Sequence, residues 1–145
     1  MPHAASLSFL AALGAALALG SAPAGAETLK YKAALDGPGE NPPTASKGVG
    51  SIEADYDTAT KTLSWSGSYS GLTGPEIAAH FHGPAAVGAN AGVLVPVDAK
   101  ASPFKGSAVL TEEQAKDFAQ GLVYFNVHTA DNKGGEIRGQ LAPAK

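Results

Sequence analysis

The chain contains no cysteine among its 145 residues. No disulfide can therefore cross-link the fold, and packing, with or without a bound ion, has to hold the chain together. The same absence excludes thiolate nucleophiles and thiolate metal ligands. Any nucleophile or metal site in this protein must use other side chains.

Charge is scarce as well. Only 16% of the residues are charged, the formal net charge is −3, and no long basic run interrupts the sequence. We therefore expect neither nucleic acid nor an anionic membrane as a partner. The sequence also lacks the GxSxG, GxxxxGK and HExxH patterns, which argues against a serine hydrolase elbow, a phosphate-binding loop and a zinc protease helix.

The N-terminus has the pattern of an export signal. Residues 4–20 form an uncharged apolar run, and Ala24-Gly25-Ala26 supplies small residues at the positions that signal peptidase accepts. We expect residues 1–26 to be a signal peptide and 27–145 to be one periplasmic or secreted domain, free of the membrane after cleavage. The alternative is an uncleaved anchor, because no Lys or Arg precedes the apolar run.

Alternation with a period of two dominates the rest of the chain and predicts β-strands with one buried face. In residues 62–70, Leu63, Trp65, Gly67 and Tyr69 alternate with four serines. The strands expected from such alternation, from the His80-Phe81-His82 segment and from one apolar run are residues 29–35, 50–56, 62–70, the segment around 80–82, 93–97, 104–110, 123–129 and 136–141.

One helix is expected among these strands. Thr111-Glu112-Glu113-Gln114 fits a capping box, in which the Thr111 hydroxyl and the Gln114 side chain each satisfy a main-chain amide, and Gly121 marks the end. Many short strands with a single helix predict an all-β fold, an antiparallel Greek-key sandwich or barrel.

Histidine is the residue that points to chemistry. Only His80, His82 and His128 follow residue 26. In an extended strand the side chains at i and i+2 point the same way, with α-carbons about 6.6 Å apart, so two imidazoles there can reach one ion. Ile77, Ala79 and Phe81 would take the opposite, buried face.

The segment 123–129 repeats this arrangement. Val123, Phe125 and Val127 form an apolar face, which leaves Tyr124, Asn126 and His128 on the other face. If the two strands are neighbours, the three histidines converge. Three neutral imidazoles suit copper, zinc or nickel and leave a coordination position open. The alternative is that all three are solvated polar residues, and spacing alone does not choose the metal.

Four other polar residues are candidates for supporting roles. Asn126, Asp131 and Glu136 carry groups that could orient an imidazole through its second nitrogen, as metal-bound histidine usually requires. Asp131 is also a typical turn residue. Tyr124 is a candidate second-layer hydroxyl, although a half-buried strand tyrosine is a common structural feature.

Several segments together resemble the CHRD domain, the module named after chordin. They are residues 79–85, with His80-Phe81-His82-Gly83-Pro84, and residues 110–114, 121–129 and 134–141. The resemblance covers most of 27–145. It implies an extracellular or periplasmic β-rich module, in a family whose function is thinly defined.

A second resemblance concerns mechanism. Residues 50–52 and 65–73, followed by the HxH strand, are similar in order to copper/zinc superoxide dismutases. This resemblance implies that His80, His82 and His128 are copper ligands and that Arg138 attracts the superoxide anion. The chain lacks the further histidines and the cysteine pair of those enzymes, so a zinc subsite is not expected. Because Arg138 shares a strand face with Glu136, we favour a surface ion pair as its role.

Two functions follow from these resemblances. The first is an exported copper protein, with copper preferred to zinc, that dismutates superoxide at a mononuclear three-histidine site. The second is a non-catalytic CHRD module that binds a protein or matrix partner, with a metal carrier as an intermediate case.

Overall fold

The computed structural model describes residues 25–98 and 100–145. The predicted signal peptide, residues 1–26, lies outside this part except for its last two positions. No helix within the described ranges has the length and apolar character needed to cross a membrane.

The strands lie where alternation predicts them, and their pairings are antiparallel. The elements are β1 (Thr28–Asp36), β2 (Val49–Asp57), β3 (Thr62–Ser70), β4 (Glu76–His82), β5 (Val93–Val97), β6 (Phe104–Val109), α1 (Glu112–Ala119), β7 (Tyr124–Thr129), β8 (Ile137–Gln140) and the short β9 (Ala142–Pro143).

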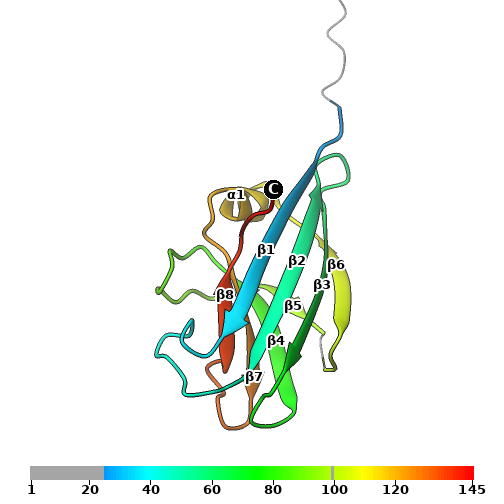
Figure 1. The fold of residues 1–145 in the computed structure, drawn as a ribbon. Helices are drawn as coiled ribbons and strands as arrows, with labels where there is room; N and C mark the ends of the chain where they lie inside the picture. The colour runs from blue at the N-terminus through cyan, green and yellow to red at the C-terminus, as the bar shows by residue number, and fades with distance from the viewer. Residues whose placement is uncertain (1–24, 99) are drawn as a thin grey trace, which may run out of the picture.

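The strands form one strongly curved sheet in the order β5-β4-β7-β8-β1-β2-β3-β6, with β9 paired to β1. Figure 1 shows β1, β2, β3 and β6 as one layer in front of β4, β5 and β7. The connections from β3 to β4, from β5 to β6 and from β6 to β7 each join strands that are not neighbours in the sheet. The prediction of an all-β, antiparallel fold with one helix is confirmed, and the sheet is nearly closed into a barrel.

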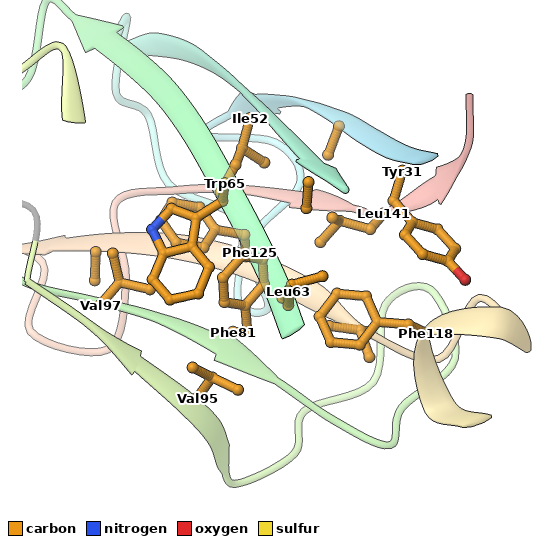
Figure 2. Close-up of a cluster of buried hydrophobic side chains, with 14 of the residues drawn as sticks. Tyr31, Ile52, Leu63, Trp65, Phe81, Val95, Val97, Phe118, Phe125 and Leu141 are labelled. Carbon is orange, nitrogen blue, oxygen red and sulfur yellow. The ribbon is translucent and has the colours of Figure 1, made fainter. Parts of the chain in front are cut away.

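The core fills the space that the sheet encloses. Trp65 lies with its ring centroid 5.3 Å from that of Phe81, and Phe81 lies 5.0 Å from Phe125. Helix α1 closes one end of the core with Phe118, which packs 5.6 Å from Tyr31 (Figure 2). These aromatic contacts join strands that are distant in the sequence.

Helix α1 begins as its sequence predicts. The Thr111 hydroxyl accepts from the Gln114 amide at 3.1 Å, and the Gln114 side chain accepts from the Thr111 amide at 2.9 Å. Gly121, with φ +71°, follows the last turn in the left-handed conformation that glycine adopts without strain.

One core prediction on β4 is wrong. Ala79 and Phe81 are buried, but Ile77 is 51% exposed. The β4–β7 register shifts between Glu76 and Ala78, so the strand has one residue more than its partner at this point. Such a bulge breaks the alternation and turns Ile77 outward.

The outer face of β7 is not solvated, because two loops cover it. Asn41, in the loop after β1, donates to the Gly88 carbonyl at 2.8 Å, and Asn90 donates to the Asn41 carbonyl at 2.9 Å. Both loops extend beside β8 in Figure 1. Every residue of β7 is therefore buried.

The carboxylate of Glu136 connects several loops at one end of the sheet. It is fully buried and accepts hydrogen bonds from the Thr129 hydroxyl at 2.8 Å, the side-chain amide of Asn132 at 2.9 Å and the Ser46 hydroxyl at 3.0 Å. It also accepts from both the amide and the hydroxyl of Thr73. Burial raises the pKa of Glu136, but these hydrogen bonds together outweigh it and hold the pKa below its usual value.

We expect Phe81→Ala to lower the free energy of unfolding by about 3–5 kcal/mol, because it removes a fully buried ring from the centre of the core. Urea denaturation would measure this change. The matched control is Val109→Ala, at a position 72% exposed, which should change stability by less than about 0.5 kcal/mol. Equal effects of the two substitutions would contradict the placement of Phe81.

We expect Glu136→Gln to lower the free energy of unfolding by about 2–3 kcal/mol at neutral pH. The new amide nitrogen is itself a hydrogen-bond donor, and it would face hydroxyl and amide groups that also donate. The pKa of Glu136 is lower in the folded than in the unfolded state, so its carboxylate stabilises the folded protein at pH values above the unfolded pKa. This contribution disappears as the pH falls through the folded-state pKa. The stability difference between wild type and variant should therefore shrink below about pH 4.5. Urea titrations at several pH values would test this, with the exposed Glu53→Gln as control. A pH-independent difference would contradict the assignment.

Candidate metal site

Strands β4 and β7 bring the three histidines together. They pair so that His80 lies opposite Asn126, His82 opposite Tyr124, and His128 opposite Ala78. All three imidazoles lie on the outer face of this strand pair. One ligand nitrogen from each ring lies within 4.8 Å of the other two. The convergence predicted from sequence is present, and the three rings form a group that could hold a metal ion.

Main-chain carbonyls orient two of the three rings. The Nδ1 of His82 lies 3.0 Å from the Ala91 carbonyl, and the Nδ1 of His128 lies 2.8 Å from the Lys133 carbonyl. Because a carbonyl oxygen only accepts, each Nδ1 carries the hydrogen, and each neutral ring presents the lone pair of its Nε2.

The Nε2 atoms of His128 and His82 differ in their partners. The Nε2 of His128 lies 3.1 Å from the Nδ1 of His80. The Nε2 of His82 is buried and has no hydrogen-bond partner among the described residues. A buried nitrogen without a partner costs free energy, and a metal ion would satisfy it.

The spacing of the rings fits a metal after a small adjustment. Metal–imidazole bonds are about 2.0–2.1 Å long, so two nitrogens on one ion lie at most about 4.2 Å apart. The observed nitrogens lie within 4.8 Å of one another, so the rings have to move closer together to share one ion. No carboxylate belongs to this group, so the donor set is three imidazoles.

The surroundings keep two of these ligands neutral. Burial is the main cause that lowers the pKa of His80 and of His82, and the neighbouring imidazoles lower both further. For His82, hydrogen bonding to Ala91 partly opposes the shift. Neutral imidazole is the form that binds metals.

Tyr124 connects His82 to Arg138. The Tyr124 ring stacks on the His82 imidazole with centroids 4.8 Å apart and planes inclined by 5°. The guanidinium carbon of Arg138 lies 3.4 Å from the centre of the Tyr124 ring. The Tyr124 hydroxyl lies 3.2 Å from the Ala91 carbonyl that also orients His82. The Tyr124 ring therefore lies between His82 and Arg138.

The surface ion pair favoured for Arg138 is wrong. Arg138 is only 2% exposed, and no ion pair within residues 25–98 and 100–145 includes it. It donates to the Asn90 side chain at 2.9 Å and to the Ala89 carbonyl at 2.6 Å. The loop between β4 and β5 encloses the guanidinium, which alternation along β8 alone does not indicate.

The three residues considered for orienting an imidazole lie in different surroundings. Glu136 connects the loops described above, and Asp131 is exposed in the turn between β7 and β8. Asn126 is buried beside His82, and its side chain also interacts with Glu40. Main-chain carbonyls accept from the Nδ1 atoms of His82 and His128, and the Asn126 side chain also interacts with His82.

Glu40 is a buried carboxyl that sequence reasoning missed. It is 6% exposed, and burial raises its pKa to about 7, although Asn126 and the charge of Arg138 both act to lower it. Gly135, with φ +125°, gives it room, because a Cβ there would collide with the Glu40 carboxyl and the Asn126 amide. Its place in a Gly/Pro-rich loop gave no signal of burial.

An open hollow of about 340 Å³ adjoins His80. Small side chains from β4 and β5, among them Ala78 and Pro96, line it together with Asp98 and Lys100. His80 is the least buried of the three histidines. This hollow provides a route from solvent toward the group.

Comparison with known proteins places the chain in a family. The family model for the CHRD domain matches residues 31–141, which include the three histidines, Tyr124 and Arg138. No curated protein matches the chain, and no solved structure does. Because the family model covers most of its length, the chain belongs to the CHRD domain family.

Proposed function

We propose that this CHRD protein is exported, that His80, His82 and His128 hold one copper ion, and that the ion dismutates superoxide. The observation that carries the proposal is the group of three imidazole nitrogens within 4.8 Å, one of them buried without a hydrogen-bond partner. Orientation by main-chain carbonyls supports it, because the second ring N–H of a metal-bound histidine usually donates to such an acceptor.

The donor set favours copper over zinc. Nitrogen sites bind Cu²⁺ more tightly than the other divalent first-row metals, including Zn²⁺. Three imidazoles without a carboxylate or thiolate leave at least one position for a small ligand. Bound copper would supply one-electron chemistry, in which one superoxide is oxidised to O₂ and a second takes that electron and two protons to give H₂O₂.

Access to the site supports a small substrate. The hollow beside His80 is the side from which superoxide would approach; its lining contains the exposed cation Lys100, together with the carboxyl groups of Glu76 and Asp98. Arg138 does not reach solvent, because it is buried and bonded to Asn90 and Ala89. We therefore assign anion attraction to Lys100 and place Arg138 behind the site.

The first prediction concerns copper stoichiometry. The protein comprising residues 27–145, loaded with Cu(II) and desalted, should retain one copper per chain by elemental analysis. His80→Ala, His82→Ala and His128→Ala should each weaken binding by at least about 100-fold, because each removes one of three ligands. The exposed Ser66→Ala is the control and should bind as wild type does. A folded wild type that retains no copper would refute the proposal and favour a non-catalytic interaction module.

The second prediction concerns turnover. Copper-loaded wild type should consume superoxide in a pulse experiment. With the His80→Ala/His128→Ala double variant, superoxide should disappear no faster than in buffer that contains a chelator. Lys100→Gln should lower the rate several-fold at low ionic strength and less at high salt, because screening weakens attraction of the anion. Stoichiometric copper without turnover would refute the dismutase activity and indicate a metal carrier.

A further inference from the structure

Arg138 provides a buried positive charge behind the three-histidine group. It is 2% exposed, and both of its hydrogen-bonded partners, the Asn90 side chain and the Ala89 carbonyl, are neutral. A guanidinium stays charged at any pH that the protein tolerates. Removing such a charge from water costs several kcal/mol of free energy unless other groups compensate it.

The strand order places Tyr124 between this charge and a histidine of the site. β7 lies between β4 and β8, so His82 approaches Tyr124 from one side and Arg138 from the other. The imidazole and the phenol ring are nearly parallel, and the guanidinium carbon lies 3.4 Å from the ring centre. The three groups form a continuous stack from β8 to the metal ligand.

We propose that Arg138, acting through the ring of Tyr124 stacked on His82, raises the affinity of the three-histidine group for Cu(I) relative to Cu(II). The physical reason is charge. The three ligands are neutral, so Cu(II) brings one more positive charge than Cu(I) into a poorly solvated region that already contains a guanidinium. A unit charge about 10 Å away, at an effective dielectric near 20, shifts such an equilibrium by roughly tenfold.

Glu40 is the counter-charge that opposes this effect. Its carboxyl is buried and interacts electrostatically with Arg138, and it also lies beside Asn126. Among the described residues, Asn126 and Arg138 are the side chains that shift the pKa of Glu40. Since its pKa is about 7, Glu40 is mostly neutral at pH 6 and mostly ionised at pH 8. Arg138 is therefore uncompensated at pH 6 and partly compensated at pH 8.

This inference rests on the proposed copper site but is tested separately from it. Affinities for Cu(I) and for Cu(II) would be measured on the purified exported protein, by competition with a chromophoric chelator for each oxidation state. The quantity of interest is the ratio of the two affinities. This readout does not depend on superoxide turnover.

The two variants should act in opposite directions. Arg138→Gln should lower the Cu(I)/Cu(II) affinity ratio about tenfold, because it removes the cation. Glu40→Gln should raise the ratio several-fold at pH 8, where it removes an ionised counter-charge, and should leave it unchanged at pH 6. The exposed Lys105→Gln, on β6, removes a solvated charge and should change the ratio less than twofold.

A purely structural role for Arg138 predicts a different result. If the guanidinium only fastens the loop at Ala89 and Asn90, Arg138→Gln would weaken both oxidation states alike, and Glu40→Gln would not raise the ratio. That pattern would overturn the inference. If Arg138→Gln fails to fold, Arg138→Lys replaces it; this variant retains the charge and should keep the Cu(I)/Cu(II) affinity ratio within about threefold of the wild-type ratio. Glu40→Gln then decides between the two roles of Arg138. Absence of copper from wild type in both states would instead refute the proposed function, and the inference with it.

Discussion

Burial of the outer face of β7 is the constraint on which the histidine group depends. The inner face of this strand is covered by the core, and the loops after β1 and between β4 and β5 cover the outer face. The second loop also brings the Ala91 carbonyl to His82. Without this cover, the imidazoles would be solvated side chains on an ordinary sheet. With it, the His82 ring is oriented and desolvated, and burial lowers its pKa, which are the conditions that a metal ligand needs.

Buried polar groups hold this cover in place. Arg138 bonds to the loop between β4 and β5, and Glu136 connects the loops at the end of the sheet through Thr73, Thr129, Asn132 and Ser46. A chain without disulfides has few other means of fixing loops over a strand. The same residues thus serve stability and site geometry, because the loop that Arg138 holds also carries the Ala91 carbonyl that orients His82.

The strands and the helix could be predicted because their signals are local. Alternation in 62–70 reports which side of a strand is buried, and the Thr111 capping box reports a helix start from four adjacent residues. Ile77 was mispredicted because a bulge is set by the partner strand β7, which the sequence of β4 does not contain. Glu40 was missed because its burial depends on contacts with β7 and β8, far away in the chain.

The sequence by itself determined the type of fold, the donor chemistry and the absence of any thiolate alternative. It also determined that His80 and His82 share a strand face, because i and i+2 always do in an extended chain. Only the tertiary structure decided that His128 lies diagonally across from His80, that Arg138 is buried behind Tyr124, and that main-chain carbonyls orient the rings of His82 and His128. The physical reason is that register and loop packing are settled by contacts between distant segments, whereas side-chain direction along one strand follows from backbone geometry alone.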